Sequence, residues 1–115
     1  MGVTALDHIY SETHSWDDTV AFREGLGFSF AERWGEEGHR AGRMVAGDAA
    51  LVLAKADDSK EPELAVFLAL EGADTFEIGD SVEVEQPLSN THWGTRWIRV
   101  RDPEGRVFCL EEAPG

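Results

Sequence analysis

Hydrophobic and polar residues alternate along several short stretches of the chain, which is the period of a β-strand that buries one face. Between the first two of these stretches, apolar residues take the wider spacing of a helix that turns one side toward a core. The helical spacing covers residues 16–26. The alternating pattern predicts strands over residues 3–11, 28–34, 40–46, 49–54, 64–70 and 81–86.

The predicted helix over residues 16–26 carries signals at both ends. Ser15 is placed to cap its first turn. Asp17 and Asp18 lie in that turn, where the positive end of the helix dipole favours negative charge. Gly27 follows the last turn, the position at which glycine most readily ends a helix. The buried side is expected to consist mainly of Trp16, Val20 and Leu26, helped by Ala21 or Phe22.

The last part of the chain has the pattern of strand, tight turn, strand. The turn is Asp-Pro-Glu-Gly at residues 102–105, where Pro103 pre-sets one backbone angle and Gly105 accepts a positive φ. Alternating residues flank it on both sides and predict a seventh and an eighth strand. Before the sixth strand, residues 71–76 hold at most one helical turn, and residues 35–38 read as a turn.

This order of elements resembles the vicinal oxygen chelate superfamily, which includes glyoxalases, bleomycin-resistance proteins and extradiol dioxygenases. Leu-Asp-His-Ile, Ala-Phe-Arg-Glu-Gly-Leu-Gly-Phe, Val-Ala-Gly-Asp and Asp-Pro-Glu-Gly carry the resemblance, at residues 6–9, 21–28, 45–48 and 102–105. It implies an α+β fold of two βαβββ modules, at residues 1–56 and 62–115, that form a curved mixed sheet around a cavity. The second module is degenerate because its helix is shortened. In character the chain is most similar to small bleomycin-resistance-like proteins.

Length and composition agree with one small domain. At 115 residues the chain can bury a single core. It has no apolar run of about 18 residues, so no membrane span is expected. Its first residues lack the basic and apolar regions of a signal peptide, and its one cysteine, Cys109, excludes an internal disulfide. We therefore expect a cytoplasmic protein.

The net charge is strongly negative. Ten basic and twenty-three acidic side chains give −13, which repels phosphate backbones and argues against nucleic acid as a partner. Two interpretations of this charge stay open. It reflects solubility or a high-salt or high-G+C bacterial background, or it attracts a cationic ligand.

The resemblance implies that one face of the sheet packs on helices and the other lines a ligand cavity. Because successive strand residues point to opposite faces, alternation sorts the residues between the two, and a slip of one residue would invert any strand. Trp93 lies next to a glycine at a strand end, where a cavity mouth is expected. The other candidate ligand-binding residues are His8, Tyr10, Glu12, Val52, Phe67, Trp97, Arg99, Cys109 and Glu111.

Metal-dependent members of the superfamily carry ligands on the first, fourth, fifth and eighth strands. The corresponding residues are His8, Val52, Ala65 and Cys109. Only His8 suits an oxygen-activating centre, because a thiolate prefers softer metals and the other two residues cannot coordinate. We therefore expect neither a metal nor another cofactor. A displaced site could use Glu12, His14 and Glu111, but nothing in their spacing demands one.

Three candidate residues have competing interpretations. His8 is either a hydrogen-bonded structural residue or a proton acceptor and candidate catalytic group. Arg99, if buried, needs a partner, which could be Glu12, Glu111 or a ligand carboxylate. Cys109 is either a small buried hydrophobe or a nucleophile, and a nucleophile would need a nearby base or cation, for which the sequence shows no Cys-His-Asx set.

The resulting prediction is a small-molecule-binding protein that holds an aromatic ligand without metal. Trp93 and Trp97 would stack on a planar ligand, and Glu12 and Glu111 would favour a cationic one, whereas Arg99 would favour an anion. Catalysis stays open; the alternative is a metal-dependent lyase, isomerase or dioxygenase that uses His8. A third interpretation is a module whose cavity is closed by side chains. The truncated second module leaves apolar surface uncovered, so we expect a homodimer.

Overall fold

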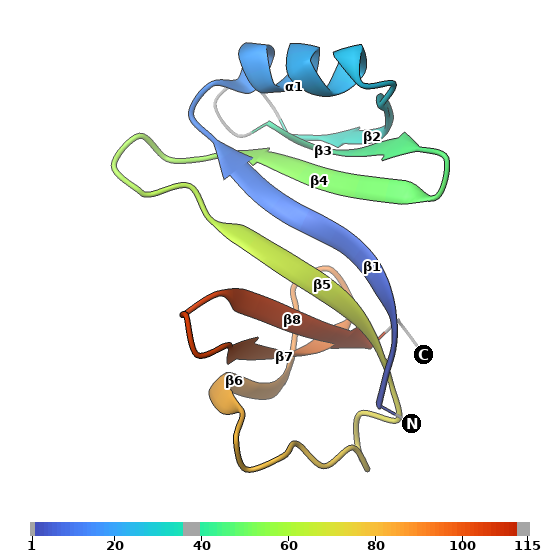
Figure 1. Cartoon of the computed structure of the whole chain (residues 1–115), viewed down its shortest axis with the longest axis vertical. Coiled ribbons are helices and arrows are strands. Elements are labelled where there is room, and N and C mark those ends of the chain that lie inside the picture. The colour runs from blue at the N-terminus through green and yellow to red at the C-terminus, as the bar shows by residue number, and fades with distance from the viewer. Residues whose placement is uncertain (1, 36–39, 113–115) are drawn as a thin grey trace. The chain divides into compact units, whose positions relative to one another are not determined.

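The computed structural model describes residues 2–35 and 40–112 (Figure 1). The chain folds into two compact units. Residues 8–64 form the N-terminal unit, and residues 2–7 join residues 65–112 in the C-terminal unit. The first strand, β1 (Gly2–Thr13), therefore contributes to both. The turn expected at residues 35–38 falls largely outside the described residues.

The N-terminal unit is a four-stranded sheet with one helix. Its strands lie in the order β2-β3-β4-β1, with β1 parallel to β4 and the other neighbours antiparallel. The core includes Met44 and Leu53, which are fully buried. In chain order the elements after β1 are α1 (Trp16–Gly25), β2 (Ser29–Trp34), β3 (Ala41–Ala46) and β4 (Ala49–Lys55).

Helix α1 turns a half-polar side toward the sheet. Its partly buried residues follow helical spacing, but they include Thr19 and Arg23, and no residue of α1 is fully buried. Arg23 donates a hydrogen bond of 2.6 Å to Ser11 of β1. Trp16 stacks on Phe30 of β2, with ring centroids 6.1 Å apart. The helix is therefore held by hydrogen bonds as well as by apolar contact.

Three details expected of this helix are wrong. Ala21 and Phe22, one of which is expected to help form the buried side, are both exposed. Leu26 is 61% exposed, because α1 ends at Gly25 and Leu26 is its C-cap residue. Ser15 makes no capping bond through its side chain; its backbone N–H instead donates to Thr13. The end of the helix agrees with the sequence, since Gly27 has a φ of 102° just after the last turn.

The C-terminal unit contains a five-stranded arrangement in the order β1-β5-β8-β7-β6. β5 pairs with β8 in parallel, whereas β8, β7 and β6 are antiparallel. The predicted hairpin turn is present: the Asp102 carboxylate accepts the backbone N–H groups of Glu104 and Arg106, and Gly105 has a φ of 81°. The strands are β5 (Leu64–Glu71), β6 (Glu83–Asn90), β7 (Arg96–Arg101) and β8 (Val107–Glu112).

An irregular segment takes the place of a helix in the C-terminal unit. Among its described residues no helix occurs, which confirms the degenerate second module. Ala73, Phe76 and Ile78, from the segment between β5 and β6, pack on one face of the sheet. The buried strand residues of this core are Leu70, Ile98, Val100 and Leu110. Each unit thus contains a mixed sheet, and α1 lies in the N-terminal unit, which confirms the α+β class.

The sixth strand is displaced from its expected position. The alternation predicts residues 81–86, but β6 runs from Glu83 to Asn90 and includes Pro87. A proline is tolerated there because β6 is an edge strand, where a missing N–H costs no ladder bond. Among the described residues, no helix is long and apolar enough to cross a membrane.

Candidate functional site

The candidate residues of the N-terminal unit share one face of its sheet. Residue alternation along β1 puts His8, Tyr10 and Glu12 on one face, and the register sets Val52 of β4 opposite Tyr10. The other face of β1 is turned toward α1, as the bond between Ser11 and Arg23 indicates. This sorting agrees with the one expected from the sequence.

Glu12 is the best connected of these residues. Its carboxylate accepts hydrogen bonds from the Tyr10 hydroxyl (2.8 Å), the Lys60 ammonium (3.2 Å) and the Glu63 backbone N–H (2.9 Å). The side chain is 9% exposed. Burial by itself raises the pKa of Glu12, but these hydrogen bonds outweigh burial and hold the pKa below its ordinary value of 4.5. The carboxylate thus ties β1 to the segment before β5 and has its charge already compensated.

The remaining candidates lie together in the C-terminal unit. The register sets Phe67 and Arg99 on either side of Cys109, and it sets Trp97 opposite Glu111. All five project from the face opposite the core of Leu70, Ile98, Val100 and Leu110. Cys109 is fully buried and Phe67 nearly so, as expected for a thiol that serves as a small hydrophobe.

Aromatic rings form a continuous row along this face, which we call the aromatic face and define by Phe67, Trp93 and Trp97 with Glu111. The Phe67 and Trp97 centroids are 6.0 Å apart, and Trp93 meets Trp97 edge to face at 5.3 Å. The Trp93 indole Nε1 donates a hydrogen bond of 2.7 Å to Glu111, and the Thr95 hydroxyl donates one of 2.8 Å to the same carboxylate oxygen. Trp93 is 48% exposed.

Arg99 has a partner that the sequence did not suggest. Its Nε donates to Glu85 of β6, and the Nε of Arg101 donates to the other oxygen of that carboxylate at 2.6 Å. The two arginines lower the pKa of Glu85 below its ordinary value, Arg99 through the larger effect. The alternation of residues did not predict that Glu85 lies beside Arg99, because β6 carries irregularities of register that alternation cannot reveal.

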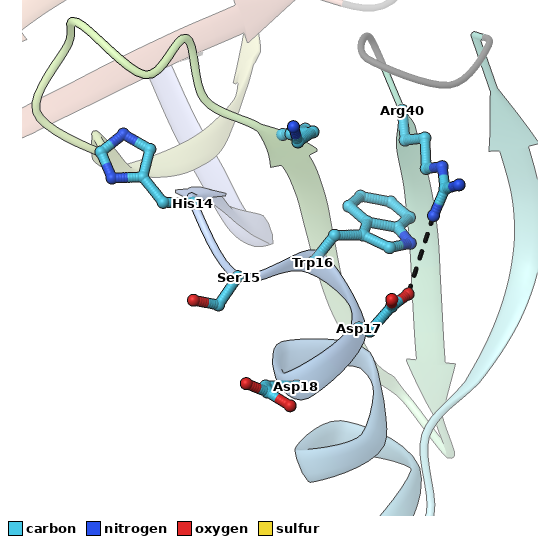
Figure 2. A pocket seen from close by; sticks show the side chains of 7 residues that line it. His14, Ser15, Trp16, Asp17, Asp18 and Arg40 are labelled. Carbon is cyan, nitrogen blue, oxygen red and sulfur yellow. Dashed lines mark ion pairs between the residues drawn. The ribbon is translucent and has the colours of Figure 1, made fainter.

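A hollow of about 430 Å³ lies elsewhere, at the start of α1 in the N-terminal unit (Figure 2). Figure 2 shows Asp17 directed at Arg40, to which it is joined by an ion pair of 3.7 Å, with the Trp16 ring beside them. His14 also lines the hollow, and its Nε2 donates to the backbone carbonyls of Asp57 and Lys60 at 3.1 and 2.8 Å. The hollow is largely polar and contains none of the predicted ligand-binding residues. The full lining is His14, Ser15, Trp16, Asp17, Asp18, Arg40 and Lys55.

The donor set does not fit the divalent metal of the metal-dependent superfamily members. Two of the four corresponding residues, Val52 and Ala65, have no atom that can coordinate, and Ala65 is buried. The third, Cys109, lies fully buried beside Phe67. Across the described parts of the chain, no group of three or more His, Cys, Asp or Glu side chains is arranged to hold a metal ion.

The chain is similar to known proteins in its three-dimensional structure, whereas comparison of its sequence finds no match. No family model and no curated protein matches the sequence. A hypothetical protein from Bacillus halodurans C-125 is similar in structure, with a TM-score of 0.71 at 12% identity over 96% of this chain and 94% of that one. So is a glyoxalase/bleomycin resistance protein/dioxygenase superfamily member from Vibrio splendidus 12B01, with a TM-score of 0.71 at 11% identity over 96% of this chain and all of that one.

A longer structure matches over part of its length. The Mn(II)-bound glyoxalase from Novosphingobium aromaticivorans gives a TM-score of 0.62 at 18% identity, over 96% of this chain but 39% of that one. Together these likenesses confirm the vicinal oxygen chelate fold that the sequence motifs predict. Because this fold supports many unrelated chemistries, the function has to be argued from the side chains of this chain.

Proposed function

We propose that this protein binds an aromatic organic ligand at the aromatic face and does so without a metal ion. One observation carries the proposal. Phe67, Trp93 and Trp97 form a contiguous row on one sheet face, and a carboxylate, Glu111, lies at the exposed end of that row. Sites for flat organic molecules are typically lined by apolar and aromatic side chains, with a few polar groups that fix the orientation of the ligand.

The absence of suitable donors supports binding without a metal. Of the four residues that correspond to ligands in the metal-dependent members, His8 alone suits an oxygen-activating centre. A single firm ligand does not retain a divalent ion. We also propose that the protein acts in the cytoplasm and forms a homodimer. The described residues of the C-terminal unit contain no helix and leave apolar positions such as Val82 and Val84 exposed, which supports the dimer.

Ligand binding is tested by quenching of tryptophan fluorescence across a library of aromatic compounds. We expect Trp97→Ala to abolish binding, because Trp97 contacts both other rings of the aromatic face. Trp34→Phe is the matched control, since Trp34 is an exposed tryptophan of the N-terminal unit. Equal binding by Trp97→Ala and wild type would place the ligand elsewhere.

The metal question is tested separately by mass spectrometry after the protein has been exposed to Mn, Fe, Ni and Zn. We expect no stoichiometric ion to be retained. Tight one-to-one binding that is lost in His8→Ala would instead support the metal-dependent lyase, isomerase or dioxygenase. The control is His92→Ala, which also removes one imidazole. His92 is exposed and does not correspond to a metal ligand of the superfamily.

A further inference from the structure

Within the aromatic face, Trp93 lies against Trp97 and Glu111 in the manner of a bound ligand. Its ring meets Trp97 edge to face, and its only side-chain hydrogen bond in the described structure is the one to Glu111. We infer that Trp93 occupies the ligand position, and that the ligand is a flat heteroaromatic ring with an N–H donor that takes its place on Glu111. This inference rests on the proposed function and specifies the ligand class for the same site.

The loop that carries Trp93 is built so that the indole can leave without opening the sheet. Thr91 and Thr95 close the loop at its base: the Thr91 N–H donates to the Thr95 carbonyl (2.9 Å), and the Thr95 N–H donates to the Thr91 hydroxyl (3.0 Å). Gly94 has a φ of 96°, and apart from its two chain neighbours no residue has an atom within 4 Å of the position that a Cβ would take. Trp93 is therefore the exposed tip of a loop whose base is independently fixed.

The Glu111 carboxylate defines the chemistry of the replacement. One of its oxygens accepts both the Trp93 indole N–H and the Thr95 hydroxyl. When Trp93 leaves, Thr95 remains and the carboxylate loses one donor. A ligand N–H restores that donor, and the ligand ring restores contact with Trp97. A ligand ring of the same shape without a donor leaves the Glu111 carboxylate with one hydrogen bond fewer, and the protein should bind that ligand more weakly.

The decisive variant is Trp93→Ala, with indole as the probe and calorimetry as the measurement. If Trp93 occupies the site, its removal ends an internal competition, and indole binds about tenfold more tightly than to wild type. If Trp93 is instead a wall against which the ligand stacks, its removal weakens binding, and the inference is overturned while the proposed function stands. Failure of indole and of the wider aromatic library to bind either protein would refute the proposed function itself.

The donor requirement is tested in the wild-type protein by comparing indole with benzofuran, which has the same shape but no N–H. We expect indole to bind about tenfold more tightly, as for a hydrogen bond to a charged acceptor. Glu111→Gln should reduce this preference, whereas Glu104→Gln, which removes an exposed charge in the β7–β8 turn, should retain it. Equal affinity for the two probes would contradict the ligand class.

Nuclear magnetic resonance gives a readout that does not depend on affinity. The four tryptophans give four indole N–H signals, and the one missing in Trp93→Phe belongs to Trp93. Saturation with indole should move this signal to the position of a solvent-exposed indole. A Trp93 signal that stays in place while indole binds would show that Trp93 is not displaced.

Discussion

Replacing Glu12 by alanine is the perturbation whose effect the structure defines most closely. The change removes the acceptor of three hydrogen bonds, from Tyr10, Lys60 and the Glu63 backbone. A bond to a charged partner contributes about 1.5–3 kcal/mol, but the Lys60 side chain is 56% exposed, so its ion pair adds at most about 1 kcal/mol. Because water can take over some of the hydrogen bonds that Glu12 accepts, we expect the free energy of unfolding to fall by about 2–3 kcal/mol.

The pH dependence of this loss follows from the direction of the Glu12 pKa shift. The pKa in the folded protein lies below the ordinary value of 4.5. The carboxylate therefore stabilises the fold fully above that value, and its contribution disappears as the pH falls through the folded pKa. The difference between Glu12→Ala and wild type should thus be largest at about pH 7 and smaller at an acidic pH below 4.5.

Urea denaturation, followed by tryptophan fluorescence at both pH values, measures the effect. Glu61→Ala is the control. Glu61 is exposed in the segment before β5, to which Glu12 binds, and its replacement changes the net charge of −13 by the same amount as Glu12→Ala. A difference of less than about 0.5 kcal/mol between the two variants at about pH 7, or a difference that grows on acidification, would show that the Glu12 carboxylate does not stabilise the fold in this way.

Three further predictions follow from other parts of the molecule. Gly42→Ala should destabilise the N-terminal unit by about 1–3 kcal/mol, because the new Cβ would lie 2.6 Å from the Phe30 ring and 2.8 Å from the Glu32 carbonyl; thermal unfolding beside Gly25→Ala, which meets nothing within 4 Å, checks this. Light scattering in moderate salt should give a homodimer, and a monomer at micromolar concentration would contradict it. Cationic aromatic compounds should bind more tightly than anionic ones because of Glu111 and the net charge; tighter binding of anions, abolished in Arg99→Ala, would reverse that conclusion.

The sequence by itself determined the order of the elements and, except for β6, the positions and faces of the strands. Strand alternation is a local property, so it placed Ser11 toward the helix and set Trp97 and Arg99 on the face opposite Ile98 and Val100. The Asp-Pro-Glu-Gly turn and the glycine at position 27 are also local, because each depends on the backbone angles of one or two residues. The order of these signals was enough to predict the fold.

Only the tertiary structure decided which side chains meet. The partner of Arg99 is Glu85, on a strand whose irregular register no periodicity reveals. Two of the three partners of Glu12, Lys60 and Glu63, come from a connecting segment about fifty positions along the chain. The covering of the C-terminal sheet by Ala73, Phe76 and Ile78 likewise depends on the path of an irregular segment. The seating of Trp93 on Trp97 and Glu111 is of the same kind. Contacts of this kind form only when the strands have paired and the loops between them have closed, so neither strand alternation nor turn motifs reveal them.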